Sequence, residues 1–241
     1  MIKLHTFGRL SLTGPEGHEI SSVLAQPKRV AVLTYLALAT PRGLHRRDTL
    51  LGLFWPDLDQ EHARGALRQA LSFMRRSLGD VIETRGDEEV GLLTEDFWCD
   101  ALDFEASLDA GQLPEALDLY EGDLLDGFFI GDAPEFEHWL DRERARLRRL
   151  AAEAAWALAD ESETEGRGPD AKRWGRQAVS FAPDDESALR RLIALLDRVG
   201  DRAQAVSAYE VFARRLGEEY ELEPALETQE LIDGIRTKLE R

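Results

Sequence analysis

The sequence predicts two domains of different class, an α+β domain over residues 1–96 followed by an all-α repeat domain over residues 97–241. Short β-compatible segments flank three amphipathic helices in the first part, whereas helical patterns dominate the second part. A glycine–alanine pattern also recurs in the second part at a fixed period. The length of 241 residues fits one or two folded domains, since domains commonly have about 100–200 residues.

The amino-terminal domain is predicted to begin with strands and to continue with helices. Residues 2–7 are β-compatible, and the turn formers of residues 13–17 separate them from a return strand that starts near Glu19. Apolar residues at helical spacing then predict one helix around residues 30–37. A second helix is predicted over residues 46–54, where a Trp–Pro pair ends it because the residue before proline avoids the helical region.

A third helix and a hairpin complete this domain. The helix runs from about Gln60 to Leu78 and closes at Gly79, a residue type that commonly ends helices. Residues 81–84 and 90–93 follow as two β-compatible runs joined by a short turn. Strands, three helices and a hairpin in this order predict an α+β winged helix-turn-helix domain for residues 1–96.

From about Phe97 onward the sequence shows no convincing strand. The pattern Gly-x4-Ala occurs three times, at Gly111/Ala116, Gly166/Ala171 and Gly200/Ala205. The last two copies are 34 residues apart, which is the length of a tetratricopeptide repeat, a helix pair that buries its apolar face by stacking on neighbours. Because this register breaks after Leu216, we expect a divergent, tetratricopeptide-like all-α helical repeat domain over residues 97–241.

The charge of the chain is distributed unevenly. The net charge is −17, which by itself argues against nucleic acid as a partner. Residues 1–100 carry 12 Lys/Arg and 14 Asp/Glu, whereas residues 101–241 carry 18 and 33. Within residues 42–76, seven arginines stand against four acids. Since salt screens charges beyond about 8–10 Å, this local basic patch matters more for DNA than the total.

The third helix has a polar face of the kind that enters the DNA major groove. Opposite its apolar line a helical wheel places His62, Gly65, Gln69, Ser72, Phe73 and Arg76. Gln69 fits adenine, Arg76 fits guanine or a phosphate, and Phe73 fits a thymine methyl group. The small Gly65 lets the backbone approach the bases.

Ten side chains are therefore candidates for DNA contact: Arg46, Arg47, Arg64, Arg68, Gln69, Ser72, Phe73, Arg75, Arg76 and Arg85. Arg46 and Arg47 open the second helix, where phosphates are in reach, and Arg85 lies at the hairpin tip. The third helix alone also fits a solvated amphipathic helix with ordinary surface arginines. The short helix before it and the hairpin behind it favour the DNA-binding interpretation.

These residues resemble a known family. Residues 47–56 and 66–79 are similar to the winged helix of SARP-type antibiotic regulatory activators, which is itself similar to that of OmpR/PhoB-type response regulators. The bacterial transcriptional activator domain that accompanies it is resembled by residues 116–128, by Trp139 with residues 143–147, by Gly200 and Asp201 with Ala205 and Tyr209, and by residues 221–224. The resemblance extends over nearly the whole chain in the order of the family.

The resemblance implies sequence-specific binding of double-stranded DNA, commonly at direct repeats by paired protomers, and recruitment of RNA polymerase. It therefore implies a homodimer on DNA. The base-facing positions of such winged helices correspond here to Gly65, Gln69, Ser72, Phe73 and Arg76. Gly65 and Phe73 stand where relatives often carry basic side chains, so the resemblance leaves the target sequence open.

The sequence contains none of the common catalytic, cofactor-binding or metal-binding motifs that we considered. Phosphate-loop, zinc-protease and nucleophile-elbow motifs do not occur, and the five histidines and Cys99 lack ligand spacing. We therefore expect no enzyme activity, no cofactor and no metal site. The chain has no run of about 18 apolar residues and no secretory signal, so we expect a cytoplasmic protein without a membrane partner.

One rival function remains open on the sequence. It is a tetratricopeptide-like interaction adaptor whose winged domain no longer binds DNA. The acidic net charge, Gly65 and Phe73 are the features that favour it.

Overall fold

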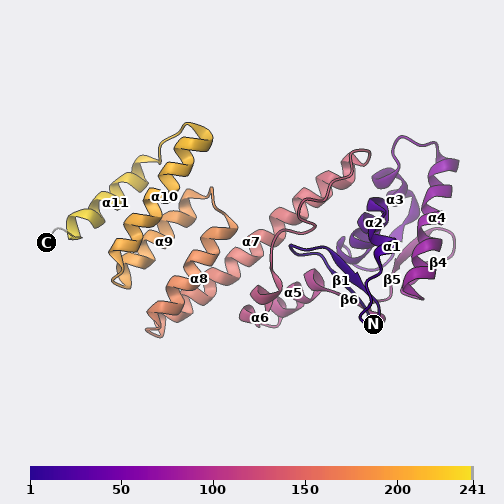
Figure 1. The fold of residues 1–241 in the computed structure, drawn as a ribbon, viewed down its shortest axis with the longest axis horizontal. Helices are drawn as coiled ribbons and strands as arrows, with labels where there is room; N and C mark the ends of the chain where they lie inside the picture. The colour runs from indigo at the N-terminus through magenta and orange to yellow at the C-terminus, as the bar shows by residue number, and fades with distance from the viewer. Residues whose placement is uncertain (240–241) are drawn as a thin grey trace. The chain divides into compact units, whose positions relative to one another are not determined.

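The computed structural model describes residues 1–239 (Figure 1). The chain divides into two compact units, Met1–Leu147 and Arg148–Arg241. Residues 240 and 241, the end of the second predicted domain, lie outside the described residues.

The first unit contains both strands and helices. In chain order they are β1 (Ile2–His5), β2 (Ser11–Thr13), α1 (Ser21–Leu24), α2 (Pro27–Leu38), β3 (His45–Arg46), α3 (Arg47–Phe54), α4 (Gln60–Leu78), β4 (Ile82–Arg85), β5 (Glu89–Leu92), a 3-10 turn (Thr94–Asp96), β6 (Phe97–Cys99), α5 (Asp100–Asp109) and α6 (Leu113–Leu119). The long helix α7 (Pro134–Thr164) begins in this unit and crosses the unit boundary.

Two small sheets organise the unit. In the first, of order β2-β1-β6, β1 pairs antiparallel with β2 and parallel with β6, with Leu4 opposite Cys99. In the second, of order β3-β5-β4, all pairs are antiparallel. The expectation that no strand follows Phe97 is therefore wrong, because residues 97–99 pair with the distant first strand. The return strand expected near Glu19 is reduced to an isolated bridge between Thr13 and Glu19.

The three predicted helices and the hairpin are present as α2, α3, α4 and β4–β5. The apolar line expected on α4 is buried, with Ala63, Leu67, Leu71, Met74 and Leu78 each at most 5% exposed. Proline at its first residue begins α2, since the fixed proline φ suits a first helical turn. Burial of this line fixes which face of α4 remains on the surface.

The second unit is helical among its described residues. It comprises the end of α7, α8 (Gly168–Phe181), α9 (Glu186–Arg198), α10 (Arg202–Tyr220) and α11 (Leu226–Leu239), which follow one another as a row of paired helices (Figure 1). The predicted 34-residue period relates the starts of α8 and α10. The longer α10 accounts for the break in register, because it adds a turn and more before α11 begins. The tetratricopeptide-like arrangement is thus consistent with the structure.

The Gly-x4-Ala pattern has a common structural cause at all three sites. Gly111, Gly166 and Gly200 have φ between +72° and +79°, a left-handed conformation that glycine adopts without steric cost. The next backbone N–H reaches the carbonyl five residues back, from Gln112 to Ser107 and equally at residues 167 and 201, each at 2.8 Å. Each pattern thus ends one helix and turns the chain into the next.

The alanines of the pattern explain its spacing. Ala116, Ala171 and Ala205 are all 0% exposed, because each lies on the buried side of the helix that starts after the glycine. A larger side chain at these positions would separate helices that pack there.

The compact units do not coincide with the domains predicted from the sequence. The sequence predicts a boundary after residue 96, whereas the first unit continues to Leu147. The reason is that β6 completes the β2-β1-β6 sheet and α5 packs beside it. No helix within the described residues 1–239 combines the length and apolar character that crossing a bilayer requires.

Candidate nucleic-acid interface

The first turn of α4 is fixed by a side-chain cap. The carboxylate of Asp59 accepts hydrogen bonds from the backbone N–H groups of Glu61 and His62, both at 3.0 Å. The His62 backbone and ring hydrogen bonds hold the pKa of Asp59 below its ordinary value. Asp59 thereby remains charged, fixes the turn between α3 and α4 and sets the direction in which α4 leaves it.

The outward face of α4 presents polar groups in an ordered row. Gln69 is exposed, and Arg76 donates a hydrogen bond of 2.8 Å from Nη1 to Ser72 Oγ, one turn earlier. Gly65 is exposed, with open space where a Cβ would stand. This face therefore offers an amide, a hydroxyl and a guanidinium, with a gap at Gly65 where another molecule can come close to the backbone.

Phe73 lies at the edge of the outward face of α4, on the side away from Arg64 and Arg68, and is half-buried. The Arg29 guanidinium, from the first turn of α2, stands 3.6 Å from the centre of its ring, and Arg76 stands 5.9 Å away. Phe73 thus has a partner within the chain, and its ring brings two cations to this edge of the helix. Sequence reasoning did not include Arg29, because nothing local links it to Phe73.

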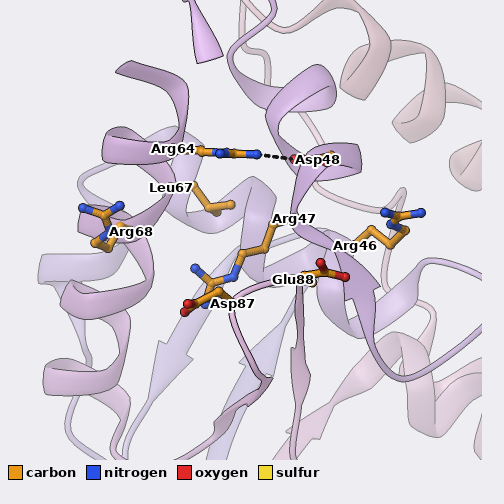
Figure 2. Close-up of a pocket in the computed structure, with 8 residues that line it drawn as sticks. All are labelled: Arg46, Arg47, Asp48, Arg64, Leu67, Arg68, Asp87 and Glu88. Carbon is orange, nitrogen blue, oxygen red and sulfur yellow. Dashed lines mark ion pairs between the residues drawn. The ribbon is translucent and has the colours of Figure 1, made fainter. Parts of the chain in front are cut away.

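A hollow of about 620 Å³ lies between α3, α4 and the β4–β5 turn (Figure 2). Eight residues line it: Arg46, Arg47, Asp48, Arg64, Leu67, Arg68, Asp87 and Glu88. The structure thus brings four of the predicted arginines together. Arg64 is directed toward Asp48, with Nη2 and Oδ1 3.6 Å apart (Figure 2). The buried Arg47 Nε has no hydrogen-bond partner among the described residues.

The remaining two predicted arginines contact the hairpin. Arg75 donates to Thr84 Oγ1 at 3.3 Å and so connects the last turns of α4 to β4. Arg85, at the end of β4, forms an exposed ion pair of 3.3 Å with Glu89 across the hairpin. Neither contact removes the positive charge from the surface, since surface ion pairs are weak and exchange readily.

Two basic residues near this surface, Arg42 and His45, have different surroundings. Arg42 donates to the Ala37 carbonyl at 3.0 Å and is paired with Glu105, which also pairs with Arg146. His45 is buried in β3, and burial together with Arg42 lowers the pKa of its imidazole. Arg42 thus stabilises the unit, and His45 stays neutral at physiological pH.

The acids at the hollow are the other residues that sequence reasoning missed. Asp87 and Glu88 lie in the β4–β5 turn and were visible in the sequence as an acidic run, yet only the fold brings them opposite Arg47. The guanidinium groups of the hollow and the outward face of α4 have the chemistry that contact with a polyanion requires. No three His, Cys, Asp or Glu side chains are grouped to hold a metal ion within residues 1–239.

Comparisons with known proteins agree with this architecture. The solved structure "Mycobacterium tuberculosis EmbR in complex with low affinity phosphopeptide" is similar to this chain, with a TM-score of 0.62 and 19% sequence identity. The similarity covers 98% of this chain and 65% of the EmbR chain, so this chain spans about two thirds of that length. At this identity the comparison shows a common fold. No curated protein matches the chain.

The family comparison covers the helical region. The family model described as "Bacterial transcriptional activator domain" matches residues 101–236. It begins near the boundary that the sequence predicts after residue 96 and extends from α5 into α11. Because it covers more than half of the residues, the chain belongs to the family of transcription regulators that carry the bacterial transcriptional activator domain.

Proposed function

We propose that this protein is a sequence-specific DNA-binding transcriptional activator. In this proposal residues 1–96 act as a winged helix-turn-helix domain, with α3 and α4 as the helix pair and β4–β5 as the wing. The observation that carries it is the outward face of α4, where Gln69, Ser72 and Arg76 stand in a row beside clustered arginines. A helix with such a face fits the major groove, where hydrogen-bonding side chains distinguish the bases.

The candidate residues divide into two roles. Gln69, Ser72 and Arg76 point outward and suit base edges, while Phe73 suits an apolar contact with a thymine methyl at the margin. The other candidates suit phosphates, which fix the position of the protein on the duplex: Arg46, Arg47, Arg64, Arg68, Arg75 and Arg85. The base contacts determine the sequence, and the phosphate contacts supply most of the salt-dependent affinity.

The helical region is proposed to act on the transcription machinery. Its family membership supports a role in activation, and we propose RNA polymerase as the partner and paired protomers on direct repeats as the bound form. This function belongs in the cytoplasm, where DNA and polymerase are found in bacteria. It requires no catalytic step and no cofactor.

Selection of DNA from a pool of random or genomic fragments by the full chain tests the proposal. We expect an enriched motif, with direct repeats about one helical turn apart, since paired protomers then lie on one face of the duplex. Salt titration of the best binder should give a slope of log affinity on log salt near about −4 to −5 for roughly four to six phosphate contacts per protomer. Absence of enrichment at about 50 mM salt would contradict it.

The hollow also favours a second candidate, an interaction adaptor that does not bind DNA. Three of the eight lining residues are carboxylates, Asp48, Asp87 and Glu88, which oppose phosphates. An adaptor would show tight binding to a protein partner, with no salt-sensitive affinity for duplex DNA. The same selection and titration therefore separate the two candidates.

A further inference from the structure

The β4–β5 turn places carboxylates among the arginines proposed to bind phosphates. Asp87 and Glu88 line the same hollow as Arg46, Arg47 and Arg68 (Figure 2). Both acids are exposed to solvent. A phosphate that approaches these arginines must therefore also approach two like charges.

The backbone holds this turn in place. The Arg47 N–H donates to the Glu88 carbonyl at 2.8 Å, at the point where α3 begins. Glu89, which follows the turn, lies opposite Arg85 of β4 and opposite Arg46 of β3 in the strand register. The turn is thus tied to both neighbouring strands and to the start of α3, and this holds the backbone of Asp87 and Glu88 beside the hollow.

The rest of the hairpin is acidic as well. Glu83 and Glu89 accompany Asp87 and Glu88, and the single arginine of the hairpin, Arg85, is already paired with Glu89. A wing of ordinary DNA-binding character would add positive charge near the backbone. This one adds negative charge to the lining of the hollow.

We propose that Asp87 and Glu88 are specificity-determining residues that hold down the sequence-independent affinity for DNA phosphates. The inference rests on the proposed function, because it concerns the same surface. Non-specific binding depends almost wholly on phosphate contacts, so it falls when carboxylates oppose the arginines. Base contacts from Gln69, Ser72 and Arg76 lie on another face of α4 and are spared. Low non-specific affinity leaves the protein free to reach its sites among a large excess of other DNA.

Binding of a duplex that lacks any selected motif tests the inference in the full chain. The variant carries Asp87→Asn and Glu88→Gln, which keep shape and remove two charges. The control is Glu83→Gln, an exposed acid of the same hairpin that does not line the hollow. Fluorescence anisotropy with a labelled 20-base-pair duplex gives the affinity between about 50 and 200 mM salt, and circular dichroism establishes that each variant is folded.

We expect the double variant to bind about fivefold more tightly at about 100 mM salt, as two screened like-charge repulsions disappear. The salt slope should steepen by about one for each arginine that gains a phosphate. Glu83→Gln should change the affinity less than about twofold. Equal affinity of wild type and double variant, or an equal gain from Glu83→Gln, would overturn the inference and leave DNA binding standing. Failure of every protein to bind at about 50 mM salt would overturn DNA binding itself.

Discussion

At the scale of single residues, Asp100 is the buried carboxylate that joins the amino-terminal strand to α5. Its oxygens accept hydrogen bonds from the Thr6 N–H and hydroxyl, both at 2.6 Å, from the Phe7 N–H at 2.9 Å and from the Ala101 N–H at 2.8 Å. It is only 3% exposed, and these four donors satisfy it. The carboxylate therefore fixes the end of β1 against the first turn of α5.

Asp100→Ala should destabilise the protein strongly. The substitution leaves buried N–H groups of Thr6, Phe7 and Ala101 without an acceptor, which costs about 3 kcal/mol or more. Asp103→Ala is the matched control, since Asp103 is exposed on the same helix. Urea denaturation followed by circular dichroism should show a lower midpoint for Asp100→Ala and little change for Asp103→Ala. Equal midpoints would mean that water replaces the lost acceptor.

Residues such as Asp100 show what a sequence pattern can and cannot reveal. The outward direction of Gln69 and Arg76 was predictable, because the apolar line of α4 fixes the opposite face. The stacking of Arg29 on Phe73 and the role of Asp100 were not predictable, since each joins residues from distant segments. Local periodicity holds no information on such contacts.

At the scale of elements, two glycines differ in the space around them, Gly91 in the hairpin and Gly65 in α4. A Cβ at Gly91 in β5 would lie 2.7 Å from the Gly43 carbonyl oxygen and 3.1 Å from its carbon. A Cβ at Gly65 in α4 would lie in open space. The hairpin therefore packs against backbone that cannot move freely, whereas the middle of α4 has room for a side chain.

The same substitution should therefore have opposite effects at the two positions. Gly91→Ala should destabilise by about 1–3 kcal/mol, because backbone must shift to relieve the overlap. Gly65→Ala should stabilise by about 0.5–1 kcal/mol, because alanine loses less conformational entropy in a helix. Thermal denaturation of both variants provides the comparison. A Gly91→Ala variant as stable as the wild type would show that the backbone of residues 41–44 shifts at little energetic cost.

In the helical unit, an ion pair joins α7 to α9 and gives a pH-dependent stability. Arg198 donates to both carboxylate oxygens of Glu163, at 2.6 and 2.8 Å. The Arg198 hydrogen bonds hold the pKa of Glu163 below its ordinary value of 4.5. A lowered folded-state pKa means that the stabilisation is complete above the unfolded pKa and is lost as the pH falls through the folded one.

Glu163→Gln should consequently cost about 0.5 kcal/mol at pH 7, as expected for a partly exposed pair, and progressively less as the pH falls through the folded-state pKa of Glu163. Glu161→Gln, an exposed acid of the same helix, serves as the control. Urea midpoints measured across this pH range should converge for wild type and Glu163→Gln on the acid side. A difference that persists unchanged at low pH would assign the effect to packing instead.

Most elements were predictable from local pattern, and the exceptions have a common cause. The long helix α4 agrees with its predicted ends, because an aspartate cap and a terminal glycine stand on either side of an amphipathic run. The strand β6 was missed because three residues carry too little alternation, and among the described residues 1–239 the strand that pairs with it is the distant β1. A strand forms by pairing with another strand, which can be distant in sequence. A helix forms its hydrogen bonds within its own segment, so its signals are local.

At the scale of the whole molecule, the family match and the contact-based division describe different aspects of the chain. The family match begins at residue 101, close to the boundary predicted from the sequence, whereas the first compact unit extends to Leu147. The first helices of the matched region thus belong to the same compact unit as the candidate DNA surface. The boundary predicted after residue 96 stays a prediction, drawn from the change of composition and period there, whereas packing across that position depends on β6 and α5.

The charge distribution of the chain also predicted the candidate site only in part. The basic segment at residues 42–76 was visible in the sequence and does supply the arginines of the hollow. The acidic lining was not foreseen, because Asp87 and Glu88 come from a turn that reaches α3 only after the hairpin folds. The net charge of a segment shows which charged side chains it contains. Which of these side chains lie close together depends on the fold.

The most direct test of the central claim is the affinity of the full chain for its selected DNA after Arg68→Ala and Arg76→Ala together. One residue lines the hollow and the other stands on the outward face of α4. The control, Arg173→Ala with Arg214→Ala, removes the same charge from exposed positions in the helical unit. We predict a loss of at least about 100-fold for the α4 variant, because a base contact worth about 1–3 kcal/mol and a phosphate contact are lost together. We predict less than a threefold loss for the control (roughly 0.6 kcal/mol). Equal affinities of the α4 variant and the wild type would contradict the claim that α4 reads DNA.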